Sequence, residues 1–189
     1  SSDVLPILDI VFQEPAIRYL QAQHEQGAMY MANGCARATR SPGICLVGPG
    51  PGITNCISGV GQAFYTSTPS LLIGIEESGQ FLGLGSAIHH DLDAVAVLKP
   101  VTKLSFRVER ADRLMEGLQR AFRVCLSGRK GPVYMGIDLA ILHHEVEIEA
   151  PILRGSKVDF SHPADPRAIS RAVELLAAAE RPVALAGGG

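Results

Sequence analysis

The sequence predicts an α/β fold with a doubly wound, mostly parallel sheet. Short apolar runs alternate along the chain with segments of helical pattern. The runs are apolar throughout and do not alternate with polar residues, which is typical of parallel strands covered on both faces. The expected strands are residues 17–20, 44–47, 71–75 and 133–137.

Between these runs lie segments with the composition or the spacing of helices. In residues 110–126 the apolar side chains fall on one face of a 3.6-residue period, and Gly128 stands where such a helix would end. Residues 25–39 are rich in alanine and methionine, and glycines within residues 52–65 favour close helix packing. The expected helices are residues 4–12, 25–39, 52–65 and 110–126.

A change in composition near residue 149 indicates a domain boundary. The next stretch lacks periodicity and contains two prolines and a glycine. Asp165 then suits a helix N-cap, with Pro166 at the first helical position, and a strand is expected from Val183. Both ends of the chain interrupt an expected pattern, so we expect a fragment of a longer polypeptide. The expected division is a first domain in residues 1–148, a linker in 149–164 and the beginning of a central α/β domain in 165–189.

Composition narrows the class of protein. The chain has 189 residues, is 47% hydrophobic and carries a formal net charge of -2. Without clustered lysine and arginine we expect no nucleic-acid partner, and no apolar run approaches the ~20 residues of a membrane span. The four cysteines lack CxxC spacing and the N-terminus lacks a signal-peptide pattern. We therefore expect a cytoplasmic protein with reduced cysteines, no membrane contact and no metal site within this chain.

Two short segments are the candidates for chemistry. Residues 24–28, His-Glu-Gln-Gly-Ala, place the carboxylate of Glu25 just inside a helix start. Residues 50–55, Gly-Pro-Gly-Ile-Thr-Asn, place a turn between an apolar run and the next helix. Glycine allows close approach of backbone to a ligand, and a helix start offers free N–H groups. Taken alone, Glu25 would be a surface glutamate favoured by the helix dipole.

Together these segments resemble the pyrimidine-binding domain of thiamine-diphosphate enzymes, in particular the acetolactate synthase-like group. The similarity continues through residues 31–39 and extends over segments at 99–103, 131–138 and 181–189. It implies that Glu25 hydrogen-bonds N1′ of the cofactor's aminopyrimidine, which favours the imino form that accepts the thiazolium proton. A site closed to water is expected to raise the pKa of Glu25.

The resemblance also assigns the turn to the pyrimidine end of the cofactor. Its candidate contacts are Gly50, Pro51, Gly52 and Asn55. The family usually has Thr-Ser where this chain has Gly-Pro before the turn, which puts the usual substrate preference in doubt. A dinucleotide loop is the alternative interpretation, but the spacing is not G-x-G-x-x-G and the prolines remove N–H donors.

A histidine pair is the third candidate. His89 and His90 follow a glycine-rich loop. In the acetolactate synthase-like group the matching segment reaches the active site and often carries glutamine, whereas keto-acid decarboxylases of the superfamily carry a histidine pair nearby. Either imidazole could protonate or orient a substrate carboxylate. The alternative is a polar loop with two solvated histidines.

The resemblance implies thiamine diphosphate and Mg²⁺ as cofactors. The family's metal ligands follow a Gly-Asp-Gly motif in a separate domain, and this sequence has no such motif, so the fragment alone is expected to be inactive. The family's site forms between subunits, which implies a homodimer or homotetramer. Whether the second domain binds FAD or an acyl-CoA stays open.

The expected activity is decarboxylation of a small-molecule 2-oxo acid, with ligation of the product to a second carbonyl. Three alternatives remain: a simple 2-oxo acid decarboxylase, a catalytically silent structural or regulatory homologue, and a nucleotide-binding module of an oxidoreductase. The last would use an acidic residue after the second strand, where Glu76 and Glu77 stand.

Overall fold

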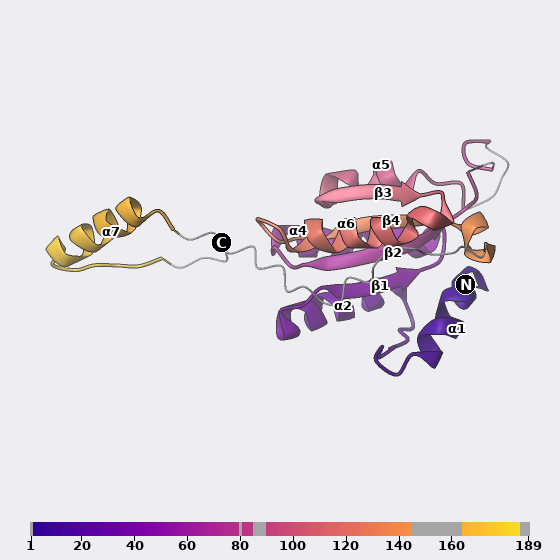
Figure 1. Ribbon diagram of the computed structural model, residues 1–189, viewed down its shortest axis with the longest axis horizontal. Coiled ribbons are helices and arrows are strands. Elements are labelled where there is room, and N and C mark those ends of the chain that lie inside the picture. The colour runs from indigo at the N-terminus through magenta and orange to yellow at the C-terminus, as the bar shows by residue number, and fades with distance from the viewer. Residues whose placement is uncertain (1, 80, 85–89, 145–163, 186–189) are drawn as a thin grey trace. The chain divides into compact units, whose positions relative to one another are not determined.

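The computed structural model describes residues 2–79, 81–84, 90–144 and 164–185 (Figure 1). The chain divides into two units, residues 1–154 and 155–189. The expected linker lies almost wholly outside the described residues, so the division at residues 148 and 164 stays a prediction. No described helix has the length and apolar character needed to span a bilayer.

The first unit is built on a four-stranded parallel sheet, as the apolar runs predicted. Its strands follow the spatial order β1-β2-β4-β3. All three pairings are parallel, so the four carboxyl ends lie along one edge. The strands are β1 (Gly43–Val47), β2 (Ser70–Glu76), β3 (Leu104–Val108) and β4 (Val133–Asp138).

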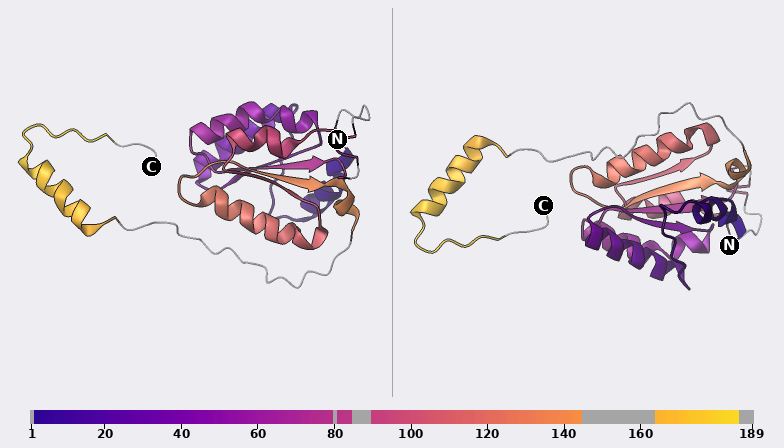
Figure 2. Two further views of the ribbon diagram at one scale, coloured as in Figure 1. Left: turned by 90° about the horizontal axis from the view of Figure 1, so that it is seen from above. Right: turned by 60° about the horizontal axis from the view of Figure 1, so that its bottom comes forward.

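Helices cover both faces of this sheet, which confirms the doubly wound class. Figure 2 shows α2 and α4 (purple) on one side of the strands and α6 (salmon) on the other. Each face has its own apolar core, one centred on Met29 and Leu72 and the other on Leu71 and Met135. The α-helices of this unit are α1 (Leu5–Gln13), α2 (Glu25–Thr39), α3 (Pro51–Thr54), α4 (Ile57–Tyr65), α5 (Ala94–Leu98) and α6 (Leu114–Leu126).

Two strand assignments in this unit differ from the sequence prediction. Residues 17–20 are not a strand, and Ile17 and Leu20 are more than half exposed. The edge strand β3 was not predicted, because its sequence, Leu-Ser-Phe-Arg-Val, alternates polar and apolar residues, whereas continuous apolar runs indicate buried parallel strands. The expected helix at residues 52–65 is in fact α3 and α4, separated at Asn55 and Cys56.

The second unit contains helix α7 (Pro166–Ala178), which begins as predicted. The Asp165 side chain accepts a hydrogen bond from the Arg167 N–H at 3.0 Å. The strand expected from Val183 is absent through residue 185, the last one described. Val183 and Leu185 are fully or nearly fully exposed, and a strand without a hydrogen-bonded neighbour has little to stabilise it.

Lys103 caps the carboxyl end of α6. Its ammonium group donates to the carbonyl oxygens of Val124 and Ser127, the latter at 2.6 Å. Lys103→Met is therefore expected to destabilise the chain by about 1–2 kcal/mol, because the Ser127 carbonyl loses this donor and the Val124 carbonyl keeps only the Ser127 hydroxyl, at 3.2 Å. Urea unfolding measures the change, with the exposed Lys99→Met as the matched control. Equal unfolding midpoints for the two variants would contradict the capping role.

Candidate functional site

The candidate residues gather at the carboxyl edge of the sheet because of where helix α2 begins. His24 has extended backbone (φ -147°, ψ 142°), and its Nδ1 accepts a hydrogen bond from the Gln26 N–H at 3.2 Å. His24 is thus the N-cap and Glu25 the first helical residue. Since α2 runs back before leading into β1, its amino end lies beside the loop that follows β1.

The structure brings Glu25 and the glycine turn into contact. Asn55 Nδ2 donates to Glu25 Oε2 at 3.0 Å, although the two residues are 30 positions apart. A Cβ atom on Gly52 would lie 4.0 Å from Glu25 Oε1. Gly52 thus places no side chain between the turn and the carboxylate.

Backbone geometry explains why the turn needs glycine and proline. Gly50 has φ 56° and ψ -110°, a conformation that residues with a side chain rarely adopt. Pro51 then occupies the first position of α3, where its fixed φ suits a helix start and its missing N–H is not needed. The turn therefore bends sharply after β1 and returns Asn55 to Glu25.

The pKa of Glu25 differs from the sequence expectation. It lies below the ordinary value of 4.5, chiefly because the Asn55 side chain donates to the carboxylate and secondarily because of a backbone hydrogen bond. Burial acts in the opposite direction, but Glu25 is only partly buried in this chain. The raised pKa that a closed site would impose is therefore wrong for the chain as it stands.

Asn55→Ala is expected to raise the pKa of Glu25, because the ionised form loses its strongest stabilising partner. A lowered carboxyl pKa stabilises the fold above the unfolded pKa, and this contribution is lost as pH falls through the folded pKa. The variant should therefore differ in stability from the parent near neutral pH and converge with it in acid. NMR titration of the Glu25 carboxyl carbon measures the pKa. An unchanged value would show that Asn55 does not hold the carboxylate.

His90 lies in a different loop at the same edge of the sheet. His89 lies outside the described residues. His90 follows β2, and its Nδ1 lies 3.8 Å from Oε2 of Glu77, which directly succeeds that strand. The structure thus puts His90 in the loop after β2, whereas Glu25 and Asn55 come from α2 and the turn after β1.

A buried charge network at this edge was missed by sequence reasoning. Arg107 donates from Nη1 to Glu76 Oε2 at 3.1 Å and from Nη2 to Asp138 Oδ2 at 2.7 Å. Tyr134 donates its hydroxyl to Glu76 Oε1 at 2.6 Å. Glu76 and Asp138 are 4% and 6% exposed. The only sequence signal is that Glu76 and Asp138 end neighbouring parallel strands, whose ends must meet.

The two carboxyl groups of this network differ in their pKa. Burial raises the pKa of Glu76 despite its hydrogen bonds from Tyr134 and Arg107. Burial also acts upward on Asp138, but donation by Arg107 and two backbone N–H groups outweighs it and the pKa lies below its usual range. Both oxygens of Glu76 are engaged within the protein, which argues against the nucleotide-binding role considered for this residue.

The same network holds the beginning of the loop after β2. Arg107 Nη2 donates to the Glu77 carbonyl at 2.7 Å, and the Gly79 N–H donates to Asp138 Oδ2 at 3.1 Å. Three strands, β2, β3 and β4, therefore converge on the first residues of the loop that leads to His90. We expect this anchoring to limit how far Glu77 can move.

Comparison with known proteins identifies the class of protein to which this chain belongs. Residues 1–97 match the family model described as "Thiamine pyrophosphate enzyme, N-terminal TPP binding domain", thiamine pyrophosphate being thiamine diphosphate. The chain therefore belongs to the thiamine-diphosphate enzymes, as an N-terminal cofactor-binding domain. Within them it belongs to the acetolactate synthase-like group.

Individual relatives agree with this assignment. The chain is 32% identical over 195 residues to a probable acetolactate synthase large subunit of Methanocaldococcus jannaschii, covering 98% of this chain and 32% of that protein. It is 38% identical over 178 residues to a probable 2-ketoarginine decarboxylase of Pseudomonas aeruginosa, covering 92% and 31%. The chain thus spans about a third of the length of these relatives.

A solved structure supports the fold independently. The crystal structure of benzoylformate decarboxylase from Polynucleobacter necessarius superposes with a TM-score of 0.83 and covers 97% of this chain and 33% of that one. Sequence identity is 20%, so this likeness concerns the fold alone.

Proposed function

We propose that this chain forms the aminopyrimidine half of a thiamine-diphosphate site, with Glu25 as the group that meets N1′. The observation that carries the proposal is the Asn55–Glu25 hydrogen bond, which holds a carboxylate beside the glycine turn at Gly52. The residues fit the ligand: a carboxylate can hold or give a proton, and glycine allows close approach of backbone to a ring.

Each residue of the half-site has a separate task in this proposal. Thiamine diphosphate supplies the carbon nucleophile that attacks a 2-oxo acid. Glu25 holds a proton at N1′, and Asn55 fixes the orientation of the carboxylate that does so. Gly52 lets the ring approach, while Gly50 and Pro51 set the turn that brings Asn55 into place. His90, with His89, would face the substrate carboxylate from the loop after β2.

The proposed reaction of the whole enzyme is decarboxylation of a 2-oxo acid followed by ligation to a second carbonyl. Similarity to an acetolactate synthase large subunit supports ligation. Simple decarboxylation is the second candidate, supported by similarity to a 2-ketoarginine decarboxylase and by the histidine pair. In either case Mg²⁺ and the diphosphate would be held by another part of a cytoplasmic homodimer or homotetramer.

The test uses the full-length enzyme of which we propose this chain is the N-terminal part. CO₂ release is measured from pyruvate and a panel of other 2-oxo acids, with and without thiamine diphosphate and Mg²⁺. Cofactor-dependent release supports the proposal, and acetolactate among the products selects ligation over simple decarboxylation. Absence of release from every acid, in a protein that still binds the cofactor, would favour a catalytically silent homologue.

A further inference from the structure

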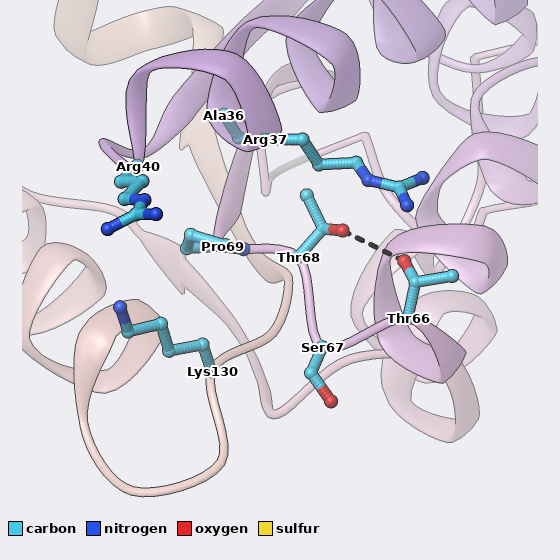
Figure 3. Close-up of a pocket in the computed structure, with 8 residues that line it drawn as sticks. All are labelled: Ala36, Arg37, Arg40, Thr66, Ser67, Thr68, Pro69 and Lys130. Carbon is cyan, nitrogen blue, oxygen red and sulfur yellow. Dashed lines mark hydrogen bonds between the residues drawn. The ribbon is translucent and has the colours of Figure 1, made fainter. Parts of the chain in front are cut away.

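A cationic pocket lies at the amino edge of the sheet, opposite to Glu25. It occupies about 260 Å³ between the end of α2, the segment before β2 and the loop before β4. The strands separate the two edges by on the order of 15 Å. Figure 3 shows the residues that matter here, namely Arg37, Arg40, Thr66, Ser67, Thr68 and Lys130.

Three positive side chains line this pocket and no carboxylate does. Figure 3 shows the charged ends of Arg40 and Lys130 on the same side of Pro69, while Arg37 extends past Thr68. Within the described part of the chain, none of the three has an ion pair or a side-chain hydrogen bond. The charged ends of Arg40 and Lys130 lie on the same side of the pocket without a counterion, and an anion between them would relieve their repulsion.

Arg37 lies in the last turn of α2 and Arg40 is its C-cap. Basic residues are common where helices end, since they pair with the terminal carbonyls. Neither arginine makes such a bond among the described residues, and the nearby hydroxyl donors Thr39 Oγ1 and Thr66 Oγ1 bond to Cys35 O and Gln62 O, each at 2.8 Å. Arg129 donates to Phe64 O at 3.0 Å. Its neighbour Lys130 makes no such bond among the described residues.

Backbone conformation distinguishes this pocket further. Arg40 has φ 58° and Ser67 has φ 54°, and among the described residues these are the two with positive φ that are not glycine. Such conformations cost on the order of 1 kcal/mol or more for residues with a side chain. Both line the same pocket, from segments 27 positions apart in the sequence. Arg40 is the left-handed C-cap with which many helices end, and arginine stands there where glycine is usual.

We propose that this pocket binds the phosphoryl groups of a small anionic ligand, at an effector site separate from the cofactor site. One guanidinium group and one ammonium group, those of Arg40 and Lys130, offer charge-assisted hydrogen bonds to phosphate oxygens, and the guanidinium group can bind them in a bidentate manner. The volume accommodates a diphosphate group. Because the pocket and Glu25 lie at opposite edges, the inference does not depend on the proposed function.

The test titrates pyrophosphate into this chain at low salt and follows backbone amides by NMR. We expect saturable shifts at residues 66–68 and none at Glu25. Arg40→Gln combined with Lys130→Gln should weaken binding at least about tenfold, because two charge-assisted contacts are lost. The matched control, Lys99→Gln with Arg123→Gln, removes the same charge from exposed positions elsewhere and should bind like the parent.

Four results would overturn the inference. Shifts that do not saturate would show general attraction, as would equal weakening by the control pair. Shifts centred on Glu25 and Gly52 would place pyrophosphate at the other edge. Binding of acetate as tight as that of pyrophosphate would point to a carboxylate ligand.

Two further titrations identify the source of the phosphoryl group and distinguish this site from the cofactor site. ADP binding at least tenfold tighter than pyrophosphate would identify a nucleotide, whereas equal binding would show that the phosphoryl groups alone are recognised. Glu25→Gln should bind pyrophosphate like the parent. That result would stand even if the full-length protein showed no thiamine-dependent activity.

Discussion

Glu25→Gln in the full-length enzyme is expected to lower kcat for CO₂ release by about 10²–10⁴-fold while leaving the fold intact. Glutamine keeps the shape of the side chain and can still bond to Asn55, but it cannot take or give the proton at N1′. The substitution also removes the titratable carboxyl group, so the variant would no longer favour the imino form of the cofactor. Initial rates at saturating cofactor, with circular dichroism as a check of folding, measure the effect.

Glu116→Gln is the matched control for this substitution. Glu116 lies in the first turn of α6, is about two-thirds exposed and pairs with Arg113 at the surface. The control should retain parental turnover, because exposed pairs of this kind contribute little. Undiminished turnover in Glu25→Gln would remove Glu25 from the chemistry. A raised Kd for the cofactor with unchanged kcat would make it a binding residue only.

Continuous apolar runs are why most of the sheet could be predicted from sequence. β2 and β4 lie inside the sheet, and β1, although at one edge, also contains few polar residues. β3 lies at the other edge and includes Arg107, which pairs with Glu76, Asp138 and Glu109. Hydrophobic periodicity and composition do not reveal such long-range partners. The sequence therefore failed to predict β3 and wrongly predicted a strand at residues 17–20.

The candidate site also has features that the sequence could predict and features that it could not. Glu25 and the glycine turn could be singled out because each is a local pattern, a helix start or a tight turn. That Asn55 bonds to Glu25 required the fold, because only parallel strands with returning helices bring residues 25 and 55 together. The pKa expectation failed for a related reason. It assumed a closed site, whereas Glu25 is partly exposed in this chain.

Gly136→Ala is expected to destabilise this chain by about 3–5 kcal/mol. A Cβ atom at position 136 would lie 1.8 Å from Glu76 Oε1 and 3.2 Å from the Tyr134 hydroxyl, far inside contact distance. Glu76 would have to leave its place, and Arg107 and Tyr134 would lose a buried partner. Overpacking typically costs about 1–3 kcal/mol, and breaking a buried ion pair about 3–5 kcal/mol. The loss would be a large part of a domain's stability.

Gly34→Ala provides the matched control, because it makes the same chemical change where there is room. Gly34 lies within α2, and a Cβ atom there would meet nothing within 4 Å. Alanine should stabilise this helix by about 0.5–1 kcal/mol relative to glycine. Urea unfolding of both variants, with slopes compared to the parent, gives the two free energies. If Gly136→Ala unfolded like the parent, Glu76 would have room to move without loss, and the network would contribute little to stability.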